Sequence, residues 1–197
     1  MTADIRASVY DWMCTYSGVK YFPAAPRVED VRIVDIAHHL ARICRYTGAV
    51  RVEHYSVAEH SVHVSHCVPP EMAFVGLMHD ASEAYVNDIS RPLKRSLPDY
   101  SRIEALNWAV IAEKFGLPIK LPAEVHAADI CVYLTERDAI MPPMPDYTGY
   151  DGYEAAPVKI LALAPNAAEY LFLQRYYELT RHLPLQPQHI TLEGCST

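Results

Sequence analysis

The feature that most constrains this chain is an apolar stretch that ends in two adjacent polar side chains. Residues Met72–Met78 are apolar throughout, and His79 and Asp80 follow at once. The stretch is far shorter than the ~20 apolar residues of a membrane-spanning helix, so we expect it inside a folded protein. Burying an imidazole and a carboxylate there costs free energy unless the two groups share a partner. The sequence therefore predicts a core that is built around a polar site.

Helical patterns surround this stretch. Asp35 is a candidate N-cap for a helix that ends at Thr47–Gly48, and Ser56–Glu59 fits a capping box for a second helix that ends at Pro69–Pro70. Further helices are expected at about 71–87, 99–115, 122–141 and 166–181. Residues 141–157 are rich in proline and predict a long loop, which is more often functional than idle.

These patterns predict an all-α fold of about six helices with little or no strand. A chain of 197 residues fits a single domain over 1–197. Its core is expected at about 35–141, with an N-terminal arm at 1–34 and, at 142–197, the long loop and the last helix.

Composition limits the classes of protein and of partner. The net charge of −7 disfavours a nucleic-acid surface, and no stretch is long and apolar enough for a membrane span or an export signal. The five cysteines include no Cys-x-x-Cys pair, which disfavours a disulfide framework or a zinc knuckle. We therefore expect a cytoplasmic protein with a small-molecule ligand, and no nucleic-acid or membrane partner.

Candidate metal ligands lie on three predicted helices. His60 and Asp129 each interrupt an apolar helical stripe, and His79 and Asp80 lie close to one point between helices. Taken singly, His60 reads as a hydrogen-bonded core histidine and Asp129 as half of an ion pair or a cap. All four together are better explained by a shared divalent ion, because buried charges are usually paired or bound to metal.

The expected ligand set has two imidazoles and two carboxylates. This mixture suits Zn²⁺, Mn²⁺, Fe²⁺, Co²⁺ or Ni²⁺ and does not choose among them. A set without cysteine disfavours a closed structural zinc site, and an ion with open positions suits metal-assisted hydrolysis. A purely structural metal site is the alternative.

The order of these residues resembles the H…HD…D signature of HD-domain phosphohydrolases, in particular bacterial 5′-deoxynucleotidases and phage-type dATP triphosphohydrolases. The resemblance covers about 35–141 and implies that His60, His79, Asp80 and Asp129 hold one divalent ion, with zinc or cobalt favoured. It also implies that Glu83 orients or deprotonates the attacking water, and that Asp88 protonates the leaving 5′-oxygen.

The same resemblance implies a set of substrate-binding residues. An Arg-aromatic pair grips phosphate and packs on the nucleoside, a proline lines the base pocket, and a lysine and a further cation meet the phosphates. The corresponding residues are Arg45, Tyr46, Pro92, Lys94 and His126. Tyr46 replaces the usual tryptophan, His126 stands where dATP enzymes have lysine, and Gly48 replaces a bulkier pocket residue.

The resemblance implies a metal-dependent hydrolase of deoxynucleotides. We expect a dATP or dNTP triphosphohydrolase that releases deoxynucleoside and triphosphate, because the short His60–His79 spacing is similar to the phage branch. The alternatives are a 5′-deoxynucleotidase acting on monophosphates and a non-catalytic nucleotide-binding module. Family members associate, so the resemblance also implies a homo-oligomer, either a dimer or a hexamer.

Overall fold

The computed structural model describes residues 11–143 and 150–182, and this part of the chain is mostly helical. The prediction of an all-α fold is confirmed: the described residues contain one small antiparallel sheet, formed by β1 (Met13–Cys14) and β2 (Lys20–Tyr21). A single bridge also joins Cys44 to Ser56. None of the helices in the described residues is both long and apolar enough to cross a membrane.

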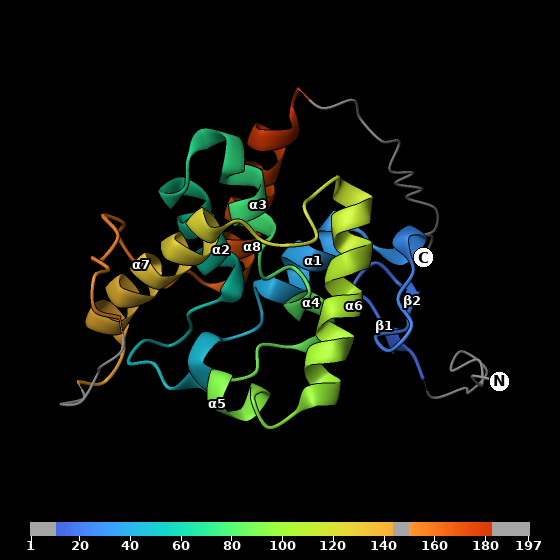
Figure 1. Ribbon diagram of the computed structural model, residues 1–197, viewed down its shortest axis with the longest axis horizontal. Coiled ribbons are helices and arrows are strands. Elements are labelled where there is room, and N and C mark those ends of the chain that lie inside the picture. Colours follow the sequence, from blue (N-terminus) through green and yellow to red (C-terminus); the bar gives the residue numbers. More distant parts are fainter. Residues whose placement is uncertain (1–10, 144–149, 183–197) are drawn as a thin grey trace, which may run out of the picture.

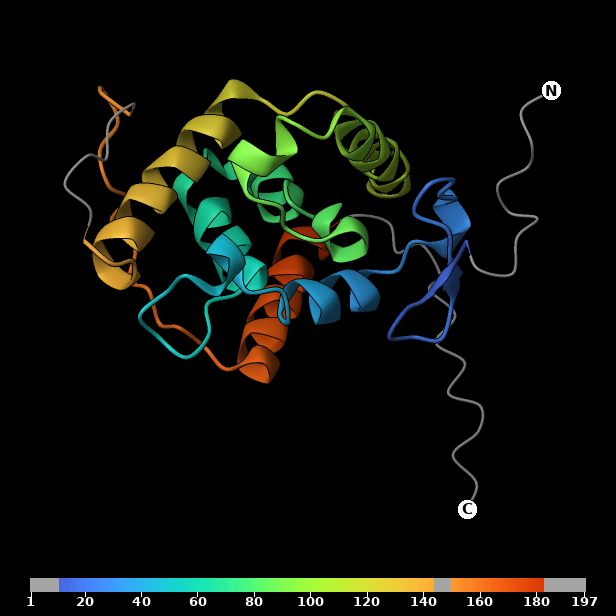
Figure 2. The ribbon, with the colours of Figure 1, turned by 90° about the horizontal axis from the view of Figure 1, so that it is seen from below.

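The longer helices surround α2 (Val57–Cys67), which lies in the middle of the molecule (Figures 1 and 2). It packs against α3 (Ala73–Met78), α7 (Ala123–Ile140) and α8 (Pro165–Thr180), and more lightly against α1 (Ile33–Leu40). Nine consecutive residues of α2 are buried, polar ones included. The polar side chains of α2 must therefore find partners inside the protein.

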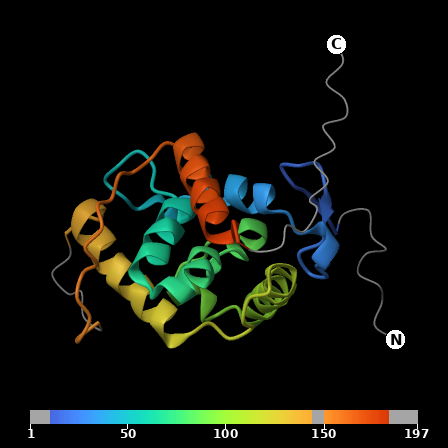
Figure 3. The same cartoon turned by 90° about the horizontal axis from the view of Figure 1, so that it is seen from above.

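The β1–β2 hairpin and α6 (Pro98–Phe115) lie at the end of the molecule opposite α7 (Figure 3). The prediction of α6 is confirmed, including its C-cap, since Gly116 is left-handed with φ 67°. The predicted last two helices correspond to α7 and α8. Of the predicted 141–157 loop, residues 144–149 lie outside the described residues.

The first predicted helix differs from the structure. Asp35 is not an N-cap, because α1 begins at Ile33 and Asp35 lies inside it. Its buried carboxylate accepts hydrogen bonds from the Ser17 N–H (2.6 Å) and the Ser17 hydroxyl (2.8 Å), which fixes the hairpin against α1. The helix also ends at Leu40 rather than at Thr47–Gly48, where the chain instead forms the 3₁₀ segment η3 (Arg45–Gly48).

The predicted helix at 71–87 is broken into pieces. Its parts are a 3₁₀ turn η4 (Pro70–Met72), α3, and the single-turn helix α4 (Glu83–Val86). Between α3 and α4 the backbone tightens, because the Ala81 N–H bonds to the Met78 carbonyl and the Glu83 N–H to the Asp80 carbonyl, each three residues back. His79 and Asp80 occupy this tight turn. The remaining described elements are η2 (Val28–Asp30) and α5 (Arg91–Lys94).

Candidate metal centre and pocket

Three predicted ligands meet in the middle of the fold. His60 comes from α2, His79 from the turn after α3, and Asp129 from α7. One ligand atom of each lies within 4.8 Å of those of the other two, so this group could hold a metal ion. The His60 Nε2 atom is 3.2 Å from Asp129 Oδ1. Residues far apart in the sequence thus form one centre.

Asp80, the fourth predicted ligand, lies beside the same group. Its Oδ2 atom is 3.2 Å from His79 Nε2 and 3.7 Å from His60 Nε2. Two imidazoles and two carboxylates therefore face one another, which is the donor set expected from the sequence. This set suits a borderline divalent ion and does not select one.

The two histidines are held so that their Nε2 atoms face the centre. His79 Nδ1 lies 2.8 Å from the Gly76 carbonyl oxygen and can donate to it, while His60 Nδ1 lies 2.6 Å from Glu136 Oε1. Both Nε2 atoms are buried and make no hydrogen bond. Buried polar nitrogens without a hydrogen bond are rare, and imidazole nitrogens turned toward two carboxylates fit a bound cation.

The electrostatics favour charged carboxylates at this centre. Burial opposes ionisation of Asp129, but the close approach of His60 Nε2 and the charges of His60 and His79 lower its pKa to about 2. Burial likewise opposes ionisation of Asp80, but His79, His60 and Arg45 hold its pKa well below the usual range. Carboxylates that stay ionised are available as ligands at neutral pH.

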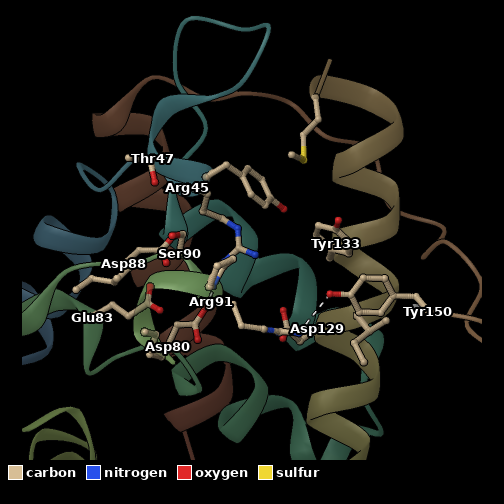
Figure 4. Close-up of a pocket in the computed structure, with 16 residues that line it drawn as sticks. Arg45, Thr47, Asp80, Glu83, Asp88, Ser90, Arg91, Asp129, Tyr133 and Tyr150 are labelled. Carbon is tan, nitrogen blue, oxygen red and sulfur yellow. Dashed lines mark hydrogen bonds and ion pairs between the residues drawn. The ribbon is translucent and has the colours of Figure 1, made fainter. Parts of the chain in front are cut away.

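Glu83 and Asp88, the two predicted catalytic carboxylates, lie next to the centre and line one pocket with Asp80 and Asp129 (Figure 4). Burial raises the pKa of Glu83 well above its usual value, and the charges of Asp80 and Asp88 raise it further. Burial also raises the pKa of Asp88. Raised carboxyl pKa values suit groups that exchange protons near neutral pH.

The pocket has a volume of about 490 Å³, within the range of small-molecule sites. Four of the predicted substrate-binding residues line it: Arg45, Tyr46, Pro92 and Lys94. The structure does not bring the fifth, His126, to the pocket lining, because it is exposed on α7. Lys94 lies 2.6 Å from Glu104, so its charge is already paired within the chain.

Arg45 and Tyr46 begin the short segment η3, which has an unusual backbone. Tyr46 and Thr47 are both left-handed, with φ of 57° and 56°. Such backbone strain in non-glycine residues costs roughly 1–3 kcal/mol each and clusters at functional sites. The turn carries Arg45 over the carboxylates, where its Nη1 atom is 3.4 Å from Asp80 Oδ2.

Sequence reasoning missed the aromatic side of the pocket. Tyr133 on α7 lies 5.1 Å from Tyr150 and 6.2 Å from Tyr46, measured between ring centroids. Arg91 bridges to this side by donating to the Tyr150 hydroxyl at 3.2 Å (Figure 4). Tyr133 follows the ligand Asp129 by one helical turn, a signal that could have placed it here. The pocket thus has an acidic floor, cationic groups and an aromatic wall.

Comparison with known proteins gives relatives without a stated activity. No family model matches the chain. The chain is 41% identical over 170 residues to the uncharacterized protein YfdR of Escherichia coli, and this match covers 84% of the chain and 94% of YfdR. It is also 32% identical over 126 residues to an uncharacterized protein of Rhodobacter capsulatus, covering 59% of the chain and 64% of that relative.

Proposed function

The chain belongs to the family of Escherichia coli YfdR, and we propose that it is a metal-dependent phosphohydrolase of deoxynucleotides. The observation that carries the proposal is the convergence of His60, His79, Asp80 and Asp129 at one centre, whose two carboxylates line a pocket. Two further carboxylates and three cationic side chains line the same pocket. A divalent ion, two proton-exchanging groups and phosphate-binding cations are what phosphoester hydrolysis needs.

Each residue has a role that its surroundings support. A divalent ion held by the four ligands would supply Lewis acidity and lower the pKa of water. Glu83 orients the attacking water and, in its ionised form, accepts a proton from it; its raised pKa makes that form a stronger base. Asp88, also raised in pKa, donates a proton to the leaving 5′-oxygen. Arg45 binds the phosphate through its guanidinium group.

The aromatic wall supports a nucleoside as the leaving group. A base or sugar can pack on Tyr133 and Tyr150, since flat rings stack favourably on one another. The deoxynucleotide class rests on the resemblance of the order of the motif residues to that of HD-domain phosphohydrolases.

The number of phosphates on the substrate separates two candidates. The triphosphatase needs cations for the outer phosphates, and the sequence assigned Lys94 and His126 to them. In the structure Lys94 is paired with Glu104, and His126 lies outside the pocket. This observation favours the second candidate, a 5′-deoxynucleotidase acting on monophosphates, in which Arg45 and the ion meet a single phosphate.

A screen of the purified protein tests the proposal. Deoxy- and ribonucleotides are supplied as mono- and triphosphates with Zn²⁺, Co²⁺, Mn²⁺, Fe²⁺ or Ni²⁺, and the products are identified. Release of triphosphate from dATP supports the triphosphatase, and release of phosphate from deoxynucleoside monophosphates supports the nucleotidase. Nucleotide binding without turnover under any ion would support a non-catalytic module and reject the hydrolase.

A further inference from the structure

Glu136 is a fully buried carboxylate that no sequence motif singled out. Its Oε1 atom is 2.6 Å from His60 Nδ1 and accepts a hydrogen bond from the Tyr55 hydroxyl at 2.6 Å. Its Oε2 atom accepts a hydrogen bond from the Tyr46 hydroxyl and lies 3.4 Å from Arg45 Nε. One oxygen therefore contacts the candidate metal centre, and the other contacts the segment η3 beside the pocket.

The division between the oxygens is the informative feature. One oxygen contacts a candidate metal ligand, and the other contacts Arg45 and Tyr46, two of the three η3 residues that line the pocket. A carboxylate kept only for packing would not need this arrangement, because burying a charge costs free energy that an apolar side chain avoids. The cost is offset by hydrogen bonds and by the charge of Arg45.

We propose that Glu136 is a positioning residue that fixes His60 as an Nε2 ligand and holds Arg45 and Tyr46 in place for the substrate. The proposal rests on the metal-dependent function proposed above. Glu136 touches neither substrate nor ion in this account. It acts through His60 on one side and through η3 on the other.

The first half of the proposal follows from imidazole chemistry. A neutral histidine has one N–H and one lone pair, so an Nδ1–H donated to Glu136 leaves the lone pair on Nε2. The Nε2 atom of His60 is the one that faces Asp129 and Asp80. Carboxylates that accept from metal-bound histidines orient the ring and raise its basicity as a ligand.

The second half follows from the backbone of η3. Tyr46 and Thr47 adopt left-handed conformations that persist only where the surroundings hold them. The hydrogen bond from Tyr46 and the charge contact from Arg45 both end on Glu136 Oε2. Removing this acceptor releases two of the side chains that line the pocket.

The test compares Glu136→Gln with Glu124→Gln, which changes an exposed carboxyl in the first turn of the same helix. Zn²⁺ affinity is measured by chelator competition in the absence of nucleotide, and Co²⁺-loaded protein is examined by absorption spectroscopy. We expect Glu136→Gln to weaken Zn²⁺ binding by about 10- to 100-fold and to change the Co²⁺ spectrum. Glu124→Gln should change neither, and unchanged Zn²⁺ affinity in folded Glu136→Gln would overturn the proposal.

The wild-type protein offers a second measurement if Glu136→Gln does not fold. Nitrogen-15 NMR of the Zn²⁺-loaded protein reports which ring nitrogen of His60 carries the proton. A proton on Nδ1 supports the proposal, and a proton on Nε2 rejects it.

Hydrolysis is measured separately, so the two proposals can fail independently. Glu136→Gln could weaken Zn²⁺ binding while the wild-type protein hydrolyses no nucleotide. That result would support the role of Glu136 and reject the proposed hydrolase activity. Where the wild type is active, Glu136→Gln saturated with metal should still show a raised KM, because η3 has lost its anchor. An unchanged KM at saturating metal would remove the second half of the proposal.

Discussion

Two fully buried glutamates, one on α2 and one on α7, illustrate two uses of the same side chain. Glu59 lies within α2, and its carboxylate accepts backbone N–H bonds from Leu161 (2.8 Å), Ala162 (3.0 Å) and Leu163 (2.7 Å). Glu136 lies on α7, and its partners are side chains of the pocket. Glu59 therefore fixes a segment of backbone, whereas Glu136 contacts side chains of the candidate metal centre and of the pocket.

The difference lies in what the partners can do. Backbone N–H groups neither titrate nor coordinate metal, so the Glu59 region is suited to holding the segment before α8, where Ala162 has a positive φ of 52°. The Glu136 region contains an imidazole, a guanidinium and phenols, which can bind metal, phosphate or a sugar. We expect substitutions on the Glu59 side to affect stability and substitutions on the pocket side to affect activity.

The largest expected effect is on the pocket side. Glu83→Gln should lower kcat by about 10²- to 10⁴-fold, because the amide cannot accept a proton from water. The free energy of unfolding should not fall, since burial and neighbouring carboxylates already disfavour the charged form of Glu83. Turnover assays and urea unfolding check both parts, and near-normal turnover would reject the role of Glu83.

At the other buried glutamate, Glu59→Gln should reduce the free energy of unfolding by about 1–3 kcal/mol. Burial raises the pKa of Glu59, but His63 and the N–H groups of Leu163 and Leu161 outweigh this and lower it below 4.5. Its contribution is therefore present above about pH 4.5 and lost as the pH falls through the lowered value.

The difference in the free energy of unfolding between wild type and Glu59→Gln should accordingly narrow as the pH falls below about 4.5. Urea unfolding at several pH values measures this. Zn²⁺ affinity should change little in this variant. A large loss of Zn²⁺ affinity in Glu59→Gln without a loss of stability would contradict the distinction between a structural role for Glu59 and a role for Glu136 at the candidate metal centre.

A smaller effect is expected at the mouth of the pocket. Arg91→Ala removes a cation that lines the pocket and bonds to Tyr150, so KM should rise about 10-fold with kcat nearly kept. Arg95→Ala is the matched control, because Arg95 follows α5 but does not line the pocket. Steady-state kinetics separate the two constants, and equal effects of the two substitutions would contradict a specific role.

The smallest effect is expected at His126. Because this side chain is exposed and outside the pocket lining, His126→Ala should change KM by less than about twofold, against the sequence-based assignment to phosphate. Kinetics with mono- and triphosphates provide the measurement. A rise in KM confined to triphosphates would restore His126 to the substrate site.

Local signals predicted much of the fold. Ser56 caps α2 by accepting a hydrogen bond from the Glu59 N–H at 3.1 Å, and Gly116 ends α6, both as the sequence indicated. The capping box is only half formed, because the Glu59 side chain bonds to the distant Leu161–Leu163 backbone instead. A local motif cannot show that a tertiary partner will take over one of its groups.

The candidate metal ligands could be proposed from helical spacing, whereas the side chains that hold them in place could not. Glu136 continues the α7 stripe of Val125, Asp129 and Val132, so its position on that face was readable from the sequence. Its partners were not, because Tyr55 and Tyr46 reach it from irregular segments. The left-handed residues Tyr46 and Thr47 are not glycines, so the sequence did not indicate their conformation. The break after Met78 depends on hydrogen bonds that a helical pattern does not reveal.

Glu59 and His60 are consecutive residues of α2, and this adjacency has a mechanical consequence. The Glu59 side chain is held by the backbone of residues 161–163, while the neighbouring His60 faces the candidate metal centre. A shift or rotation of α2 would therefore disturb the hydrogen bonds of Glu59 and the position of His60 together. The position of His60 at the candidate metal centre thus depends in part on the 161–163 segment, and remodelling that segment should change the distances between His60 and the other three candidate ligands.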